Sequence, residues 1–144
     1  MEIRPYANAD QDAVIALWHA CELVRPWNDP ARDIARKLTE QPELFLVAIE
    51  GDARVGSIMA GFEGHRGWVN YLAVAPSHRG RGLGRRLMAE VETRLAERGC
   101  PKLNLQVRAS NAAVIAFYRQ LGYVQDDVLS FGRRLIEDAP SQVG

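Results

Sequence analysis

The feature that most constrains the fold is a glycine- and arginine-rich turn that follows an apolar strand. The strand is predicted over residues 68–74, and the turn reads Arg79-Gly-Arg-Gly-Leu-Gly84. Glycine lacks a Cβ atom, so successive backbone N–H groups in this turn can converge on an anion at the positive end of a following helix. The two arginines of the turn add positive charge at the same place. The turn therefore predicts a phosphate-binding site.

Two common phosphate-binding motifs do not match this turn. A P-loop carries Lys-Ser or Lys-Thr directly after its last glycine, whereas this chain has Arg85-Arg86. The dinucleotide fingerprint G-x-G-x-x-G opens the first βαβ unit of a domain, whereas the spacing here is G-x-G-x-G in the middle of the chain. We therefore expect the phosphate to be bound by a different scheme.

Charge is balanced over the whole chain and concentrated locally. The 144 residues include 18 lysines and arginines and 18 aspartates and glutamates, so the formal net charge is zero. A neutral chain offers no broad basic face, which predicts no nucleic-acid partner and no membrane partner. Four arginines nevertheless lie between Arg79 and Arg86. Such a patch favours a small polyanion as the ligand.

The two cysteines and the N-terminal residues indicate whether to expect a metal site and in which compartment the protein is found. Cys21 and Cys100 have no C-x-x-C spacing and no histidine placed to complete a metal site. The chain starts without a basic region followed by an apolar run, and no segment approaches membrane-spanning length. We therefore expect a cytoplasmic protein that holds no metal.

Hydrophobic periodicity predicts alternating helices and strands. Asp10 is expected to cap the first helix, and Asp29 with Pro30 to begin the second. Apolar runs predict strands over residues 44–49, 55–62, 68–74 and 103–107, after an opening strand at Ile3 and before a closing hairpin that reaches Ile136. The helix between the last two long strands makes them a parallel, right-handed crossover pair.

Three motifs in this order resemble the GNAT superfamily of acetyl-CoA-dependent N-acetyltransferases. They are the turn Arg79-x-x-Gly82-x-Gly84, the strand and asparagine of Leu103-Asn-Leu-Gln-Val-Arg-Ala-Ser-Asn111, and the helix from Asn111 to Leu-Gly-Tyr123. The resemblance covers most of the chain and implies one domain over residues 1–144. It implies an α/β (α+β) fold: a mixed sheet of about six to seven strands, antiparallel at first and with a parallel pair at 68–74 and 103–107, flanked by about four helices.

Four further segments resemble the YpeA-type branch of this superfamily. These are Arg25-Pro-Trp-Asn-Asp-Pro30, Gly64-His-Arg-Gly67, Arg98-Gly-Cys-Pro-Lys102 and Arg133-Arg-Leu-Ile-Glu-Asp138.

The resemblance also implies which residues bind acetyl-CoA. In the family the turn takes the coenzyme A pyrophosphate, the backbone of the preceding strand contacts pantetheine and the thioester, and a helix tyrosine protonates the departing thiolate. Carried onto this sequence, the cofactor-binding residues are Leu72, Ala73, Val74, Arg79, Gly80, Arg81, Gly82, Leu83, Gly84, Asn111 and Tyr118. Two of these have alternatives: Tyr118 also has the spacing of an aromatic at the edge of a core, and Asn111 also suits a helix N-cap.

The residue that acts as general base cannot be carried over from a characterised group of the family. The strand at Leu105-Gln106-Val107 resembles that of the ribosomal-protein N-terminal acetyltransferases, which carry a glutamate where this chain has Gln106. An amide cannot accept a proton at neutral pH. Glu63 is the candidate base, with His65 or a chain of waters held by Asn70 and Tyr71 as alternatives. Glu63 and His65 also fit plain residues of a solvated turn.

Acceptor recognition is expected in the connector between the first two helices. Arg25, Trp27 and Asn28 combine a charge, a flat apolar face and an amide, which suit a small polar acceptor with an acidic group or a peptide terminus. Trp27 and Arg25 also fit a purely local packing role.

The predicted function is transfer of an acetyl group from acetyl-CoA to a primary amine by direct attack, on a small molecule or a peptide. Neither cysteine sits in a motif that would make it a nucleophile. The alternative is a non-catalytic acetyl-CoA-binding regulatory module. A homodimer is conceivable through an edge strand near the C-terminus.

Overall fold

The computed structural model describes residues 1–138, which divide into two units: residues 1–105 together with Asp138, and residues 106–137. The first unit contains a five-stranded sheet in the order β1-β2-β3-β4-β5. Its strands are β1 (Glu2–Pro5), β2 (Phe45–Glu50), β3 (Ala53–Phe62), β4 (Gly67–Val74) and β5 (Leu103–Leu105). Neighbouring strands are antiparallel except for β4 and β5, which are parallel. The α+β fold with a parallel β4–β5 pair is thus confirmed.

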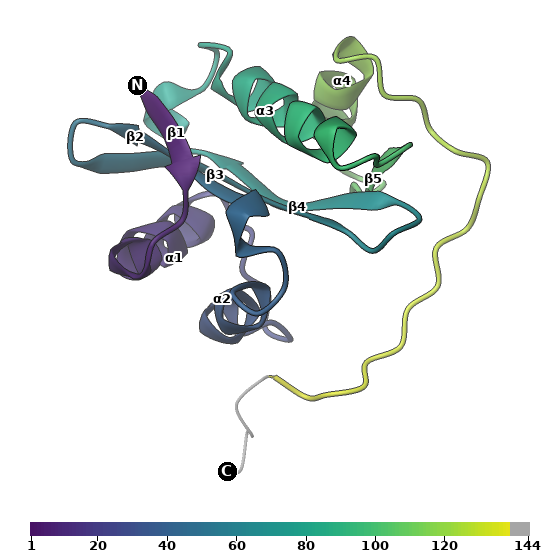
Figure 1. The fold of residues 1–144 in the computed structure, drawn as a ribbon, viewed down its shortest axis with the longest axis horizontal. Helices are drawn as coiled ribbons and strands as arrows, with labels where there is room; N and C mark the ends of the chain where they lie inside the picture. The colour runs from purple at the N-terminus through teal and green to yellow at the C-terminus, as the bar shows by residue number, and fades with distance from the viewer. Residues whose placement is uncertain (139–144) are drawn as a thin grey trace. The chain divides into compact units, whose positions relative to one another are not determined.

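Helices cover both faces of this sheet. In Figure 1, α1 (Gln11–Ala20) and α2 (Pro30–Lys37) lie on one face and α3 (Leu83–Glu97) lies on the other. The apolar stripe of α3 is buried, as its spacing of four residues predicts. Short 3₁₀ turns, η1 (Asn8–Asp10), η2 (Pro42–Leu44) and η3 (Pro76–His78), connect these elements. No helix in the described part of the chain is long and apolar enough to cross a bilayer.

The cap of α2 is as predicted, whereas that of α1 is not. Asp29 accepts the backbone N–H groups of Ala31 and Arg32 at 3.0 and 3.2 Å, and Pro30 is the first residue of α2. Asp10 precedes α1 without capping it through its side chain. Its fully buried carboxylate instead accepts hydrogen bonds from Arg4 and Arg54 at 2.8–2.9 Å. These bonds, that from Arg4 above all, hold the pKa of Asp10 far below its usual value.

The second unit contains α4 (Ala112–Gln120) and a segment without regular structure. Asn111 caps α4, because its side chain accepts the Val114 N–H at 3.2 Å. The closing hairpin expected up to Ile136 is absent from the described residues, so the sheet has five strands instead of six to seven. A hairpin is stabilised by burying one of its faces, and here the large apolar side chains are exposed: Val124, Val128, Leu129, Phe131, Leu135 and Ile136.

Candidate functional site

The glycine-rich turn brings free backbone donors to the start of α3. Gly80 and Gly82 have φ values of 76° and 78°, in the left-handed region that glycine tolerates. The first intrahelical bond runs from Arg86 N–H to Gly82 O at 3.0 Å, and no side chain caps the helix. The N–H groups of the first turn therefore lack a helical acceptor, and the helix dipole favours an anion there. Gly84 differs from the other two, because it lies within α3 and has no positive φ.

Arginine side chains surround this helix start without neutralising partners. Arg79, Arg81, Arg85 and Arg86 are all exposed, and none of them forms an ion pair within residues 1–138. Arg79 Nε donates to the Val74 carbonyl at 3.3 Å, which fixes its stem against the end of β4. Three guanidinium groups thus remain available for an anionic ligand.

The second half of β4 has an edge that β5 does not cover. The parallel register pairs Gly67 with Leu103 and ends where Val69 meets Leu105, while β4 continues to Val74. Ala75 N–H donates to Val55 of β3 at 2.8 Å. Because backbone groups alternate sides along a strand, those of Leu72 and Val74 point away from β3. They form a short row of oriented donors and acceptors beside the arginine-rich turn.

A bulge in β4 precedes this open edge. The β3–β4 register shifts between Ser57 and Met59, and Tyr71 adopts a left-handed conformation with φ of 52°. A non-glycine residue in that region is strained and needs support from its surroundings. The bulge therefore sets the direction in which the following Leu72 backbone points.

A buried hydrogen-bond relay supports the bulge. Trp18 Nε1 donates to Ser57 Oγ at 2.8 Å, and Ser57 Oγ donates to the Tyr71 carbonyl at 2.9 Å. The Trp18 and Tyr71 rings stack with centroids 3.7 Å apart. The Tyr71 hydroxyl donates to Asp33 at 2.6 Å, and burial, with this bond, raises the pKa of Tyr71. Tyr71 is thereby fixed at its backbone, its ring and its hydroxyl.

We expect Ser57→Ala to destabilise the protein by about 2 kcal/mol, because it leaves the buried Trp18 N–H without an acceptor and the Tyr71 carbonyl without a donor. Urea unfolding monitored by circular dichroism measures the loss. In a Trp18→Phe background, where the indole donor is already absent, the same substitution should cost less. Equal costs in both backgrounds would contradict the relay.

The second unit carries Asn111 and Tyr118, which the resemblance assigns to coenzyme binding and catalysis. Tyr118 is buried on α4, and its ring makes edge contacts with Phe117 and Tyr123 at centroid distances of 5.0 and 5.8 Å. Burial raises the pKa of Tyr118 to about 12, so the phenol is protonated at neutral pH. Asn111 takes the N-cap role that was one of its alternatives.

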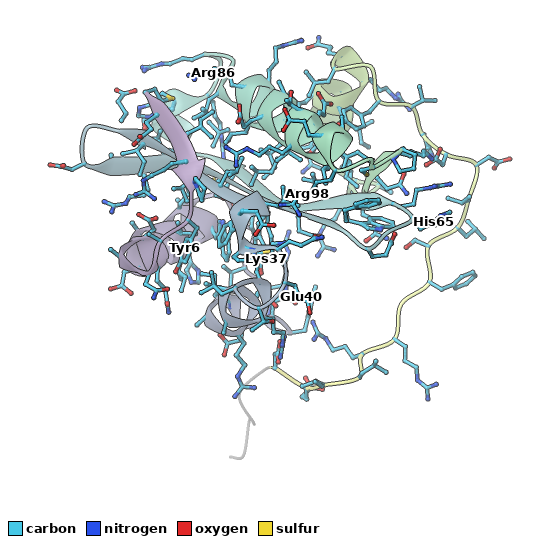
Figure 2. All side chains as sticks on the ribbon, in the orientation of Figure 1. Tyr6, Lys37, Glu40, His65, Arg86 and Arg98 are labelled. Atoms are coloured by element: carbon cyan, nitrogen blue, oxygen red, sulfur yellow. The ribbon has the colours of Figure 1, made fainter. Side chains whose placement is uncertain are left out.

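Glu63 holds the turn between β3 and β4. Its Oε1 accepts the backbone N–H of His65 at 2.7 Å and also that of Arg66. These bonds, Arg66 first, lower the pKa of Glu63 and make it a weaker base. His65 lies at the tip of the same hairpin, at the far end of the first unit from Arg86 (Figure 2).

The three predicted acceptor residues lie in the connector between α1 and α2. Trp27 is 45% exposed and Arg25 is half-buried, whereas the Asn28 side chain is hydrogen-bonded to the Tyr71 hydroxyl. The Asp29 carboxylate next to this connector contacts Arg32 at 3.6 Å. Asn28 is therefore linked to the bulge of β4.

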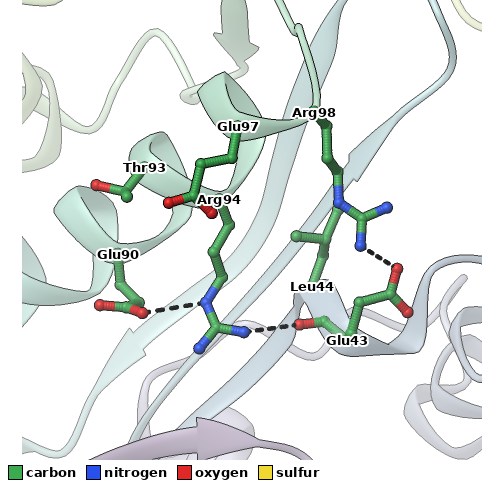
Figure 3. A pocket seen from close by; sticks show the side chains of 7 residues that line it. All are labelled: Glu43, Leu44, Glu90, Thr93, Arg94, Glu97 and Arg98. Carbon is green, nitrogen blue, oxygen red and sulfur yellow. Dashed lines mark hydrogen bonds and ion pairs between the residues drawn. The ribbon is translucent and has the colours of Figure 1, made fainter.

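A hollow of about 340 Å³ on the α3 side is lined mainly by charged residues. Figure 3 shows that Arg94 reaches Glu90 and the Glu43 carbonyl, and that Arg98 reaches the Glu43 carboxylate. Both arginines thus link α3 to η2. Because its cations are already paired, this hollow is a weaker candidate for an anionic ligand than the start of α3.

Sequence reasoning missed Trp18, Ser57 and Asp33. Trp18 had the apolar spacing of a core residue and Ser57 lay inside an apolar strand, so neither carried a motif. Ser57 and Trp18 are 39 residues apart in the chain, and only the packing of α1 on β3 makes the contact. No local signal could have identified the relay.

Comparisons with known proteins agree with this geometry. The model of the acetyltransferase (GNAT) family matches residues 12–123. An acetyltransferase of Sodalis glossinidius is 54% identical over 139 residues, 96% of this chain and 98% of its own. One of Yersinia enterocolitica is 52% identical over 138 residues, again 96% of this chain and 98% of its own.

Solved structures are similar as well. The aminoglycoside 6'-N-acetyltransferase AAC(6')-Ig of Acinetobacter haemolyticus has a TM-score of 0.76 at 19% identity, over 94% of this chain and all of that one (100%). The ribosomal-protein-alanine N-acetyltransferase of Brucella melitensis has a TM-score of 0.69 at 32% identity, over 85% of this chain and 83% of that one.

Proposed function

This chain belongs to the acetyltransferase (GNAT) family, and we propose that it transfers an acetyl group from acetyl-CoA to a primary amine by direct attack in a ternary complex. The observation that carries the proposal is the open edge of β4 directly before the start of α3. A chain that binds a long thioester with a diphosphate in its middle needs a phosphate cradle and oriented backbone groups beside it. Both features come from adjacent residues here.

The residues present fit acetyl-CoA as the co-substrate. The diphosphate suits the N–H groups from Gly82 to Arg85 and the guanidinium groups around them, whose charge is not neutralised by ion pairs among the described residues. Pantetheine, which carries amides, suits the outward backbone groups of Leu72 and Val74, with Ala73 between them directed at β3. Positions Gly80 and Gly82 leave open space where a Cβ atom would be, so the backbone can be approached closely.

In the proposed reaction the neutral amine attacks the thioester carbonyl, a C–N bond forms and the C–S bond breaks. An N–H fixed at the open edge of β4 donates to the developing oxyanion without reorganisation. The departing thiolate takes a proton from Tyr118, whose phenol is protonated because its pKa is raised to about 12. The proton that the amine loses passes to solvent or to a base. Neither cysteine is needed as a nucleophile.

Other expectations stay predictions. Membership of the YpeA-type branch is one of them. The match over nearly the full chain supports another, one domain over residues 1–144, of which 139–144 lie outside the described residues. The cytoplasmic location, the absence of a metal and the homodimer are predictions of the same kind.

The test is acetyl-CoA binding followed by thiol release in the presence of a panel of amines. Binding by calorimetry together with thiol release for at least one amine supports the enzyme. Binding without turnover for amino acids, polyamines, aminoglycosides and peptides would replace it with the non-catalytic regulatory module. Failure to bind acetyl-CoA would exclude both.

For Glu63→Gln we expect a kcat/KM that is reduced less than about three-fold, with a ratio to wild type that does not change between neutral and alkaline pH. The reason is that turn N–H groups already hold this carboxylate and lower its pKa. A pH profile with the best acceptor checks this. A large loss at neutral pH that recovers as the free amine becomes commoner would identify Glu63 as the general base.

A further inference from the structure

A pocket of about 350 Å³ lies in the first unit between the end of α2 and the strands β3 and β4. Its apolar side chains include Met59 and the 39% exposed Trp68, which lie on the same face of the sheet because Met59 pairs with Asn70 and Gly61 pairs with Trp68. Asn70 also lines it and directly precedes the left-handed residue Tyr71. One end of the pocket therefore adjoins the bulge and, beyond it, the open edge of β4.

Negative charge dominates the ionisable groups of this pocket. Glu40 and Glu63 line it, together with a single cation, Lys37. Lys37 is half-buried, and its ammonium group donates to the Ala60 carbonyl, so it is already engaged with the strand. Glu40 is exposed and forms no ion pair within the described residues. Figure 2 labels Lys37, the last residue of α2, and Glu40, which follows the helix by three residues.

The polar groups are placed at separate points of the pocket. Glu40 stands after the C-terminal end of α2, whereas Asn70 stands on β4, and no side-chain hydrogen bond of Asn70 is found among the described residues. Apolar side chains of β3 and β4 line the same pocket. These groups match an amine that carries a second positive charge. The carboxylate suits the cation, the apolar stretch suits a short alkyl chain, and the amide lies beside the bulge where the amine would react.

We propose that this pocket selects the acceptor, and that the acceptor is an alkyl diamine: one ammonium group is bound by Glu40 and the other nitrogen, as the neutral amine, lies by Asn70 toward the β4 bulge. This inference rests on the proposed acetyltransferase function and names the substrate class for it. A free diamine and a lysine side chain beside another cation share this chemistry. The acceptor with an acidic group that the sequence suggested is disfavoured, because the pocket has a net negative charge.

Gly61 offers a way to alter this pocket without breaking the fold. It lies on β3 with an ordinary φ, and an added Cβ would be 3.5 Å from Gln41 Oε1 and 3.6 Å from Lys37 Nζ, both ordinary van der Waals contacts. Gly61→Ala should therefore fold normally while its methyl group takes up space in the pocket.

The experiment compares three acceptors of similar length in thiol release with the full chain: 1,4-diaminobutane, butylamine and 4-aminobutanoate. We expect kcat/KM to fall in that order, since the second group is positive, absent and negative in turn. A short peptide with two adjacent lysines is the additional arm. Turnover of the peptide but not of 1,4-diaminobutane would identify protein lysines as the source of the same chemistry.

Variants test the roles of the pocket residues. Glu40→Gln should lower kcat/KM for the dication about three- to five-fold, the size expected for an exposed ion pair, and leave that for butylamine unchanged. Glu97→Gln, the same change on the α3 side of the sheet, should alter neither. Gly61→Ala should raise KM for both amines without changing acetyl-CoA affinity.

Two results would overturn the inference while leaving the acetyltransferase intact. One is 4-aminobutanoate reacting as well as or better than 1,4-diaminobutane. The other is turnover of unrelated amines when neither the diamine nor the lysine peptide reacts. An unchanged preference in Glu40→Gln would also remove the proposed cation site. Acetyl-CoA binding without turnover of any amine would instead refute the proposed function itself.

Discussion

Gly82→Val is expected to weaken acetyl-CoA binding about 30-fold, because valine drives the turn out of the left-handed conformation that directs its N–H groups at the ligand, and binding must restore that conformation at a cost of ~2 kcal/mol. Gly82 has a φ of 78°, which a β-branched side chain strongly disfavours. No protein atom lies within 4 Å of the added Cβ, so the effect comes from the backbone conformation and from the lost approach of the ligand. Isothermal titration with acetyl-CoA measures the affinity.

Gly99→Val is the matched control for this change. Gly99 lies at the opposite end of α3 with a φ of 82°, and an added Cβ there also meets no atom within 4 Å. Both variants should therefore lose similar stability in thermal unfolding, whereas only Gly82→Val should lose acetyl-CoA affinity. Intact binding in Gly82→Val, or equal losses in both variants, would contradict the phosphate site at the start of α3.

Tyr118→Phe is expected to lower kcat about 100-fold, the lower range for loss of a general acid, while the affinity for acetyl-CoA changes little. The thiolate would then have to take its proton from water. Since the pKa of Tyr118 is raised to about 12, its phenol stays protonated as pH rises, and this group should cause no loss of kcat/KM below that pH. Steady-state kinetics as a function of pH, with binding measured separately, check both statements.

Tyr6→Phe makes the same chemical change where no catalytic role is expected. The Tyr6 hydroxyl is buried and is the side-chain polar atom that lacks a hydrogen-bond partner among the described residues. Its removal should leave kcat unchanged and should not lower stability, because no hydrogen bond is lost. Equal activity of Tyr118→Phe and wild type would remove Tyr118 from the mechanism and leave it as an aromatic of α4.

Features encoded by neighbouring residues were predicted well from the sequence. Asp29 and Pro30 specify the start of α2 within a few residues, and Gly80 and Gly82 specify a turn that needs positive φ. The apolar stripe of α3 and the parallel β4–β5 pair follow from periodicity and from the crossover rule. All of these signals are local or involve consecutive elements.

Features that depend on contacts between distant segments were not predicted. Asp10 had the sequence of a helix cap, but Arg54, 44 residues away, together with Arg4 draws its carboxylate elsewhere. Ser57 acquires its role from Trp18 and Tyr71, which its own strand does not reveal. Asn28 is hydrogen-bonded to Tyr71, which its own segment of the sequence does not reveal.

The segment after α4 also has a structure that the sequence did not predict, and the reason again lies outside the segment itself. Its apolar residues have a strand-like composition, and a hairpin was the natural prediction up to Ile136. Strand propensity describes how well a side chain fits a half-buried pleated surface, so it decides little where the side chains stay exposed. Strand propensity also predicted β5 as far as Val107, whereas the strand ends at Leu105.

The unequal burial of the tryptophans gives this protein optical reporters of its own. Trp18 is fully buried against Tyr71, whereas Trp27 and Trp68 are 45% and 39% exposed. Intrinsic fluorescence should therefore contain a blue-shifted emission from the relay and a red-shifted emission from the other two indoles. A spectral change confined to the red component on adding a diamine, and lost in Trp68→Phe, would follow acceptor binding without any label.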